Sequence, residues 1–309
     1  MIHYFYRATD TPQSQILSKF KTGSWVYTEN PTEAELEQLQ KLGLEDGMLA
    51  DALDADEVPR FEIEDGITYV FTRFAYKNGS GKVVTAPIMI ALSPRFILTL
   101  AMVACPKLKQ FAEKGPDNIT THRSELLLEI LELLLETYAT QLNGINKQIR
   151  SARTSLNARR VSNKDFVQFV EIEDVLNEFL GDLIPANSVL QSLTGRRKNL
   201  SFDEEDHDLI EDLQLSATQL IDTIRGSLKT AVNIREAYTN IATNNLNRQV
   251  KILTTLTVVL TIPTIIGSYW GMNVNVPFHN NSHAFVFIML GSAGIAGIIL
   301  LIFRRNHWL

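Results

Sequence analysis

The sequence predicts an α/β domain, a long helical stalk and two transmembrane helices at the C-terminal end of the chain. Two apolar runs, residues 252–270 and 284–303, each have about the 20 residues that a helix needs to cross a bilayer core of ~30 Å. Before residue 118 strand and helix patterns alternate, and after residue 120 only helical periodicity remains. These three observations define the predicted fold class.

Residues 1–118 form the predicted α/β domain. The segment "PTEAELEQLQKLG" has helical spacing, with a capping box at Thr32 and Glu35 and a stop at Gly43. The turn residues of "KNGSGK" join two of the strands into a hairpin. The order of the strands does not follow from the sequence. Strands are predicted from the β-branched and aromatic runs "SWVYTE", "ITYVFTRFAY", "KVVTAPIMIAL" and "RFILTLAMV".

The rest of the chain divides into helical segments. Residues 119–200 are expected to form a helical hairpin, and residues 201–273 a stalk helix that continues into the first span. Nothing interrupts this helix before Pro263, and a proline is tolerated within a membrane helix, so it is on the order of 100 Å long at 1.5 Å per residue. An external loop (274–283), a second span (284–303) and a basic tail (304–309) follow.

Basic residues predict the orientation of the two spans. Arg248 and Lys251 precede the first span, Arg304 and Arg305 follow the second, and the loop between the spans has no Lys or Arg. Because Lys and Arg next to a span stay on the cytoplasmic side, both termini are expected in the cytoplasm and the loop outside a plasma (inner) membrane. The N-terminal residues lack the pattern of a signal peptide. The single cysteine, Cys105, fits a reducing compartment.

Composition narrows the class of protein. The net charge of -6 argues against a nucleic-acid-binding surface, so no nucleic acid is expected as a partner, and the two apolar runs imply the lipid bilayer as one. The sequence contains no zinc-protease helix, no phosphate-binding glycine loop and no nucleophile constellation around Cys105, so an enzyme is not expected.

A stripe of hydroxyl residues marks one face of the first span. Its members lie three and four residues apart, and the same register reaches Val250 and Asn247 toward the cytoplasm. A two-span subunit cannot enclose an aqueous path alone, so this candidate pore lining requires an oligomer. The alternative is that these threonines bond their own helix carbonyls or join neighbouring helices. The hydroxyl stripe comprises Thr254, Thr257, Thr261, Thr264 and Ser268.

Two further features of the spans are expected to serve helix contact. Thr255 lies off the hydroxyl stripe, and we expect it only to bond a carbonyl or join helices. In the second span Ser292 with Ala296, and Ala293 with Gly297, are pairs of small residues four apart, which allow close approach of two helices.

The residues at the end of the first span carry a family resemblance. "YWGMN" resembles the Gly-Met-Asn signature of the CorA family of divalent-metal transporters, and the second span ends in basic residues followed by "HWL" as in that family. "SWVYTENPTEAELEQL" and "YTNIATNNLNRQVKILT" extend the likeness along the chain. The resemblance implies a funnel-shaped homopentamer, with first spans lining the pore and the α/β domains at its cytoplasmic mouth.

The resemblance also implies roles for single residues. Gly271, Met272 and Asn273 would form the selectivity motif, in which a ring of Asn273 amides accepts hydrogen bonds from hydrated Mg²⁺ without stripping its water. Gly271 would permit a sharp turn at the helix end, and Met272 would pack to hold it. Asn247 and Thr264 match polar pore positions. Leu253 matches a hydrophobic constriction that can close by dewetting.

An acidic run at the start of the stalk helix suggests a regulatory metal site. Asp208, Glu211 and Asp212 belong to it, and interaction of carboxylates with the helix dipole is the alternative explanation. By resemblance, Asp212 aligns with a family aspartate that binds a regulatory divalent ion between subunits. Mg²⁺ would then be both the transported and the regulatory ion, and the site's other ligand would come from the neighbouring subunit.

The function expected from these features is Mg²⁺ uptake across the plasma membrane, and two alternatives stay open. The external loop lacks the carboxylate that many relatives carry, and it contains His279 and His283, which could ligate Zn²⁺ or Ni²⁺. A transporter of zinc, cobalt or nickel (Zn²⁺, Co²⁺, Ni²⁺), coupled to protons, is therefore the first alternative. A non-conducting, membrane-anchored metal sensor is the second.

Overall fold

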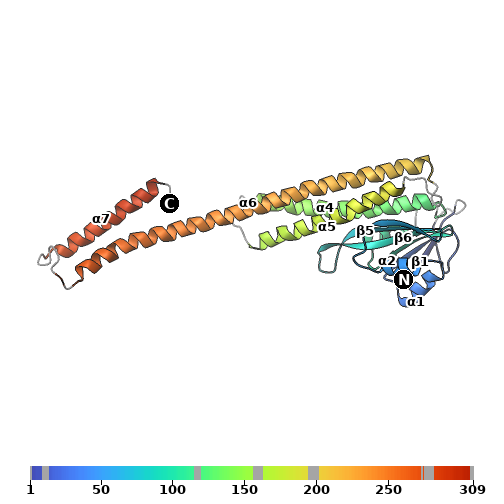
Figure 1. Ribbon diagram of the computed structural model, residues 1–309, viewed down its shortest axis with the longest axis horizontal. Coiled ribbons are helices and arrows are strands. Elements are labelled where there is room, and N and C mark those ends of the chain that lie inside the picture. Colours follow the sequence, from blue (N-terminus) through green and yellow to red (C-terminus); the bar gives the residue numbers. More distant parts are fainter. Residues whose placement is uncertain are drawn as a thin grey trace. The chain divides into compact units, whose positions relative to one another are not determined.

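The computed structural model describes residues 2–8, 14–114, 120–155, 163–193, 202–272, 274 and 282–306. Within these residues the predicted fold class is confirmed: an α/β domain precedes long helices, and two helices are apolar enough to span a membrane (Figure 1). The elements are β1 (Ile2–Tyr6), β2 (Gln15–Leu17), β3 (Ser24–Glu29), α1 (Glu33–Gln40), α2 (Asp46–Ala52), β4 (Arg60–Glu64), β5 (Ile67–Lys77), β6 (Val83–Leu92), β7 (Phe96–Ala101), α3 (Pro106–Lys114), α4 (Arg123–Ser155), α5 (Asn163–Leu193), α6 (Glu204–Trp270) and α7 (Ala284–Arg305).

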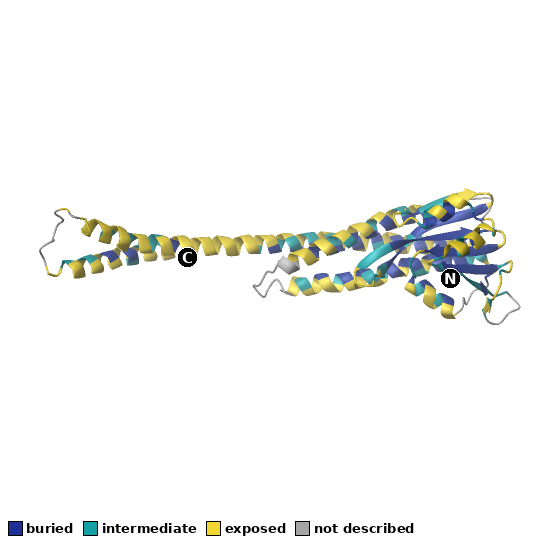
Figure 2. Ribbon diagram, turned by 90° about the horizontal axis from the view of Figure 1, so that it is seen from below, coloured by how far each residue is buried: buried dark blue, intermediate teal, exposed yellow. Residues whose placement is uncertain are grey.

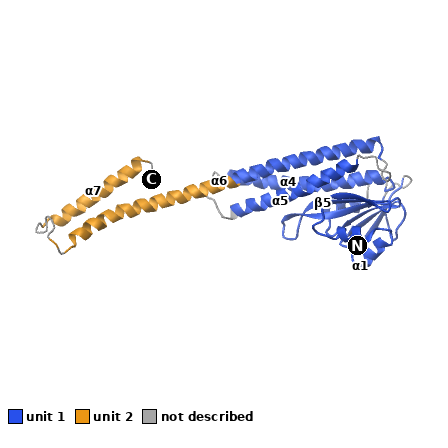
Figure 3. Cartoon of the chain, in the orientation of Figure 1, with its two compact units in different colours: residues 1–234 blue, residues 235–309 orange. Residues whose placement is uncertain are grey.

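The chain divides into two compact units, residues 1–234 and 235–309 (Figure 3). The first contains the sheet, helices α1 to α5 and the beginning of α6, and the second contains the rest of α6 and α7. Helix α6 is a single helix of 67 residues with Pro263 inside it, so the predicted continuation of the stalk into the first span is confirmed. A proline removes one backbone donor, which a long membrane helix tolerates.

A seven-stranded sheet forms the centre of the first unit, in the order β2-β1-β3-β7-β6-β5-β4. Only the β3–β7 pair is parallel among the strands described. The four predicted strands are β3, β5, β6 and β7, and β5 and β6 form the predicted hairpin. Its turn closes with a hydrogen bond from the Asn78 amide to the Lys82 carbonyl (2.9 Å), and Gly81 has a positive φ of 78° that favours glycine.

Helices α1 and α2 cover one face of the sheet and enclose the main hydrophobic core (Figure 1). Helix α1 begins with the predicted capping box, in which Thr32 and Glu35 bond each other's backbone amides. The central strands are buried on both faces (Figure 2), which explains why they appear as nearly continuous apolar runs in the sequence. The core includes Val26, Leu39, Met48, Leu49, Tyr69, Phe71, Met89, Phe96, Leu98 and Leu100.

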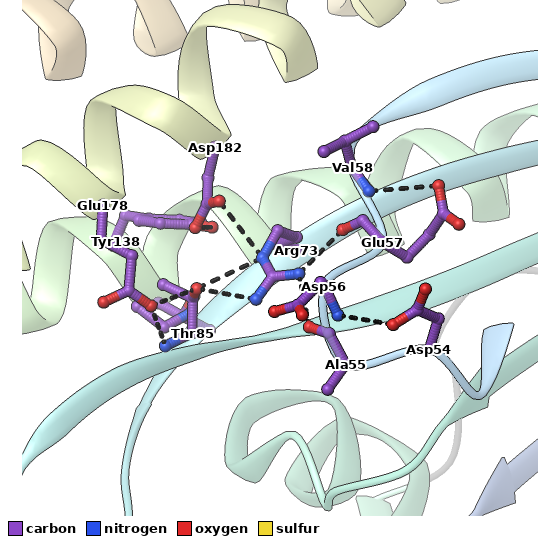
Figure 4. Close-up of polar contacts among 12 residues, drawn as sticks. Asp54, Ala55, Asp56, Glu57, Val58, Arg73, Thr85, Tyr138, Glu178 and Asp182 are labelled. Atoms are coloured by element: carbon purple, nitrogen blue, oxygen red, sulfur yellow. Dashed lines mark hydrogen bonds and ion pairs between the residues drawn. The ribbon is translucent and has the colours of Figure 1, made fainter. Parts of the chain in front are cut away.

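The opposite face of the sheet is joined to α4 and α5 by a buried polar network around Arg73 of β5 (Figure 4). Arg73 Nε lies 3.2 Å from Asp182 Oδ1 of α5, and its Nη1 donates to the carbonyls of Ala55 (3.0 Å) and Glu57 (2.8 Å) in the loop before β4. The hydroxyl of Tyr138 in α4 donates to Asp182 Oδ2 (3.1 Å). One guanidinium therefore joins the strand, the acidic loop and both helices of the hairpin.

Burial controls the charge of this network. The side chain of Asp182 is 12% exposed, and this burial raises the pKa of its carboxyl, while the charge of Arg73 and the hydrogen bonds from Thr85 and Tyr138 oppose the shift. Burial and the Asp182 carboxylate together raise the pKa of Tyr138 well above its ordinary value. Glu178 is a second carboxylate nearby, and it accepts a hydrogen bond from the Thr85 hydroxyl (2.6 Å).

The raised pKa of Asp182 predicts a pH-dependent stability term. Because the folded chain binds this proton more tightly than the unfolded chain, stability is lost as pH rises from about 3.8 through the raised pKa, and it levels off above that value. The variant Asp182→Asn lacks this term. We therefore expect the difference in melting temperature, variant minus wild type, to become more positive as pH rises from about 3.8 through the raised pKa of Asp182. Tryptophan fluorescence of the detergent-solubilised proteins measures both melting temperatures. A constant difference between the two proteins across the window would contradict the prediction.

Candidate functional site

The hydroxyl stripe lies on an exposed face of α6 in the second unit. All five members, together with Val250 and Asn247, are exposed in the single chain. The hydroxyls of Thr257, Thr261 and Thr264 donate to the carbonyls four residues earlier, at 2.9, 2.7 and 2.9 Å. These are the bonds expected under the alternative that the threonines only bond the carbonyls of their own helix. They also leave the lone pairs of each hydroxyl oxygen available to accept hydrogen bonds from water.

Helix α7 packs on a different face of α6. Reduced exposure within the span part of α6 is found at Thr255, Val259, Ile262 and Ile266, in steps of four, three and four residues, and at the adjacent Val258. At 100° per residue this face points away from the hydroxyl stripe. In α7, Ser292 (6% exposed) and Ala296 (8%) are buried, as expected for residues in helix contact, whereas Ala293 of the second pair is exposed and Gly297 is half-buried.

Thr255 shows one of the two roles expected of it, helix contact, and not the other. It is 4% exposed, so it lies within the helix contact as predicted, but its hydroxyl has no hydrogen-bond partner among the described residues. The expected bond to a helix carbonyl is therefore absent there.

The structure describes Gly271 and Met272 of the motif, and the roles expected of them in the turn stay predictions. Gly271 does not have a positive φ, and a Cβ on it would meet only ordinary contacts, to the carbonyl oxygens of Gly267 (3.5 Å) and Ser268 (3.6 Å). Met272 is 52% exposed. The helix simply ends, with the Gly271 amide still bonded to the Gly267 carbonyl (3.0 Å).

Other residues of the motif and loop lie outside the part of the chain that the structure describes. These are Asn273, the third residue of the motif, and His279 in the external loop. His283 is described and exposed, and its Nδ1 lies 2.9 Å from the hydroxyl of Ser282. Leu253, the candidate constriction, is 65% exposed and directly precedes Thr254 of the stripe.

The acidic start of α6 serves two different purposes. Asp203 and Asp206 form reciprocal hydrogen bonds, at 2.9 and 3.3 Å, between each side chain and the other's backbone amide, which caps the helix. Asp208, Glu211 and Asp212 are all exposed. Of these three, Asp212 lines a groove of about 780 Å³ between α4 and α6. The helix dipole and capping therefore explain the acidic residues in the first turn of α6. Asp212 lies beyond that turn and belongs to the groove.

This groove is lined by carboxylates and leucines. Helices α4 and α6 run side by side within the first unit, joined by a hydrogen bond from Ser227 Oγ to Asn146 Oδ1 (2.6 Å). Lys107 pairs with Glu136, which balances part of the negative charge, and His122 Nδ1 lies 3.6 Å from a carboxylate oxygen of Glu125. The α4 carboxylates in the lining are Glu125, Glu129, Glu132 and Glu136, and the leucines are Leu128, Leu135, Leu142, Leu209, Leu213 and Leu220.

Sequence reasoning missed these four α4 glutamates. Their spacing of four, three and four residues places them on one helix face, and that regularity is the signal that could have identified them. Within the described residues, no group of three or more Asp, Glu, His and Cys side chains is arranged to hold a metal ion. A divalent ion at Asp212 would therefore need a ligand from outside the described chain.

Cys105 has no features of a nucleophile. It is 1% exposed, and burial raises the pKa of its thiol to about 11. A thiol in this state is protonated at neutral pH and shielded from substrate.

Comparison with known proteins extends over the whole chain. The family described as "CorA-like Mg2+ transporter protein" matches residues 20–305. The cobalt/magnesium transport protein CorA of Methanocaldococcus jannaschii is 27% identical over 299 residues, which cover 92% of this chain and 91% of that protein. The complete structure of the CorA magnesium transporter from the same organism has a TM-score of 0.86 at 21% identity, covering 100% of this chain and 99% of that one.

A further solved structure shares the fold. The full-length CmaX protein has a TM-score of 0.73 at 18% identity, and the similarity covers 100% of this chain and 98% of that one. With the two apolar C-terminal helices and the family match over residues 20–305, the chain belongs to the family of CorA-like Mg²⁺ transporter proteins.

Proposed function

We propose that the chain is one subunit of a homopentameric channel that takes up hydrated Mg²⁺ across the plasma membrane, with both termini in the cytoplasm. The observation that carries this proposal is the exposed hydroxyl stripe on the face of α6 that points away from α7. A lone hairpin would present these hydroxyls to lipid, which is unfavourable, so the stripe is expected to face other copies across a shared axis.

The hydrogen bonds of the stripe suit a hydrated cation. Because Thr257, Thr261 and Thr264 donate their protons to the helix backbone, their oxygens present acceptors outward. The waters bound to Mg²⁺ direct their hydrogens away from the ion and need acceptors. The Asn273 amides would supply a ring of further acceptors at the outer end, and Leu253 would supply the dewetting constriction. The relatives named for magnesium and cobalt transport support Mg²⁺ as the main cargo, with Co²⁺ as a second.

Flux measurements on purified protein in liposomes test this proposal. We expect Mg²⁺ uptake that does not depend on a pH gradient. Zn²⁺ uptake that rises with an inward proton gradient would instead indicate a proton-coupled zinc transporter, which the uncharged external loop and His283 favour. Absence of flux for Mg²⁺, Co²⁺, Ni²⁺ and Zn²⁺ from a correctly assembled oligomer would indicate a metal sensor.

Regulation by cytoplasmic Mg²⁺ is proposed at the groove that contains Asp212. The carboxylates of the groove repel one another, and a divalent ion shared with a neighbouring subunit would relieve this repulsion and hold the pore closed. Asp208 and Glu211 lie one turn or less away along α6 and would add to the negative potential.

The variant Asp212→Asn tests the regulatory site. We expect the internal Mg²⁺ concentration that half-inhibits uptake to rise about tenfold, because the neutral amide loses ~1.4 kcal/mol of attraction for the ion. The matched control is Asp222→Asn, which removes an exposed α6 carboxylate paired with Arg225 outside the groove. Equal shifts in the two variants would show that general charge, and not this position, controls inhibition.

A further inference from the structure

Helix α5 is weakened at one place, over residues 181–185. Pro185 lies inside the helix and has no backbone N–H, so the carbonyl of Gly181 lacks the amide that would bond it in a regular helix. Glycine is a weak helix former, and a Cβ at Gly181 would meet no atom within 4 Å apart from the backbone of its own helix. Packing therefore does not require a glycine there. Proline and glycine are the usual positions at which a helix bends.

The two halves of α5 are attached to different parts of the first unit. Before residue 181, Glu178 accepts hydrogen bonds from the amide (3.0 Å) and the hydroxyl (2.6 Å) of Thr85 in β6. After Pro185, the carbonyl of Leu190 accepts a hydrogen bond from Nε2 of Gln214 in α6 (3.2 Å). The weak place thus separates a half that is held by the sheet from a half that is held by α6.

A buried ion pair fixes α5 at this place. Asp182 follows Gly181 directly, lies 3.2 Å from Arg73 of the sheet and accepts a hydrogen bond from Tyr138 of α4 (Figure 4). The side chains of Asp182 and Arg73 are each 12% exposed, and separating them would leave two buried charges without partners. The ion pair therefore stabilises the form of α5 seen in the structure.

Space is available beside the weak place. A groove of about 460 Å³ lies between the start of β4 and residues 184–192 of α5, and Pro185 lines it. A small cavity of about 20 Å³ is lined by Arg73, Tyr138 and Leu183, among others. Close packing, which resists movement elsewhere in a protein interior, is incomplete at both of these surfaces.

Movement of α6 would reach the weak place through Gln214. Asp212, two residues earlier on α6, lines the acidic groove together with four glutamates of α4. Helix α4 is itself held by the sheet, because the amide of Ala75 donates to the hydroxyl of Thr137 (2.9 Å). Without a divalent ion these carboxylates repel one another, which pushes α6 away from α4. The half of α5 after Pro185 would follow α6, while the half before Gly181 stays with the sheet.

We propose that α5 is a hinge that bends at residues 181–185 when Mg²⁺ leaves the acidic groove, and that the Asp182–Arg73 ion pair is the latch that opposes this bend. The inference rests on the proposed regulation by cytoplasmic Mg²⁺, and it names the element that moves. Two forms of α5, latched and bent, give the discrete states that such regulation needs.

Distances between spin labels on the assembled oligomer test the hinge. In a Cys105→Ser background, labels are placed by Asp174→Cys on the sheet-held half of α5 and Asp222→Cys on α6, both exposed positions. Labelled chains are diluted with unlabelled chains, so that pulsed electron paramagnetic resonance reports the distance within one chain. We expect this distance to lengthen by at least about 3 Å when Mg²⁺ is removed with a chelator.

A second pair of labels serves as the control for general loosening. Ser80→Cys and Asp174→Cys both lie on the sheet side of the weak place, where Lys82 and Glu171 form an ion pair at 3.1 Å. We expect the distance between these two labels to stay unchanged when Mg²⁺ is removed.

Helix variants test the bend itself. Gly181→Ala and Pro185→Ala stiffen α5, and we expect each to reduce the distance change by at least about half. The matched control is Gly144→Ala, which makes the same change inside α4, where a Cβ would also meet no atom within 4 Å apart from its own helix backbone. We expect Gly144→Ala to leave the distance change intact.

Latch variants test the ion pair. We expect Asp182→Asn to show the long distance even at saturating Mg²⁺, and to raise the internal Mg²⁺ concentration that half-inhibits uptake about fivefold. Pro185→Ala should lower that concentration, a change in the opposite direction that loss of stability alone would not produce. If Asp182→Asn does not assemble, Tyr138→Phe removes one hydrogen bond to Asp182 and is expected to act in the same direction as Asp182→Asn.

The outcomes separate the hinge from the proposed function. A distance change that Gly181→Ala and Pro185→Ala leave intact, or that Gly144→Ala reduces equally, would overturn the hinge. A wild-type distance that does not respond to Mg²⁺ would overturn it as well. If the wild-type oligomer conducts no Mg²⁺ while its distance still responds to Mg²⁺, the channel function is wrong and the hinge is supported.

Discussion

Replacement of Asn273 by alanine is expected to reduce Mg²⁺ flux about 100-fold. In a homo-oligomer the substitution removes one amide acceptor from every subunit at once. Each lost hydrogen bond to the hydrated ion is worth ~1 kcal/mol, and a tenfold change corresponds to ~1.4 kcal/mol, so the loss of three or more bonds reaches 100-fold. The measurement is the initial rate of Mg²⁺ uptake into liposomes that contain equal amounts of assembled wild type or variant.

Two further variants isolate the chemistry of the amide. Asn273→Gln keeps the amide on a longer side chain, and we expect it to restore part of the flux. Met272→Ala changes an exposed neighbouring residue whose thioether sulfur is a much weaker hydrogen-bond acceptor than an amide oxygen. We expect this variant to lower Mg²⁺ flux less than threefold. Wild-type flux through Asn273→Ala, with the oligomer intact by size-exclusion chromatography, would exclude the amide ring as the selectivity element.

The long elements of the fold were predictable because each carries its own signal. β5 and β6 are buried on both faces and appear as apolar runs, and α6 shows helical periodicity for 67 residues. β1, β2 and β4 were missed, as were α2 and α3. β4 reads "RFEIE", and β2 has only three residues, so their strand character comes from pairing with neighbouring strands and not from local sequence.

The candidate site also has a part that the sequence predicts and a part that depends on the packing of distant segments. The hydroxyl stripe was predictable because all its members lie on one helix, where spacing alone determines the face. The groove was not, because Asp212 and the α4 glutamates, about 80 residues apart in sequence, line it together only through the packing of α4 against α6. Similarly, the Arg73 network joins a strand, a loop and two helices, and no periodicity within one segment could indicate it.

The variant Leu253→Asn is expected to open a leak in the regulated state. Leu253 is 65% exposed and borders the hydroxyl stripe, so in an oligomer its side chain would narrow the path just inside Thr254. A ring of leucines expels water from a narrow pore and blocks a hydrated ion, whereas a ring of amides keeps the pore wet. At an internal Mg²⁺ concentration that closes the wild type, we expect the residual flux of the variant to be at least about tenfold higher, since wetting removes ~1.4 kcal/mol or more of the barrier.

Leu256 provides the control for this prediction, because it is also exposed (54%) and lies three residues later, 60° further from the centre of the hydroxyl stripe. Leu256→Asn introduces the same polar group into the same span, so any general damage to membrane insertion or assembly should match that of Leu253→Asn. If Leu253 forms the constriction, only its variant conducts at high internal Mg²⁺. If the two variants leak equally, the added flux comes from a loosened subunit contact, and the barrier must lie at another residue of the path. If neither leaks, dewetting at Leu253 does not close the pore, and closure would have to come from movement of the helices themselves.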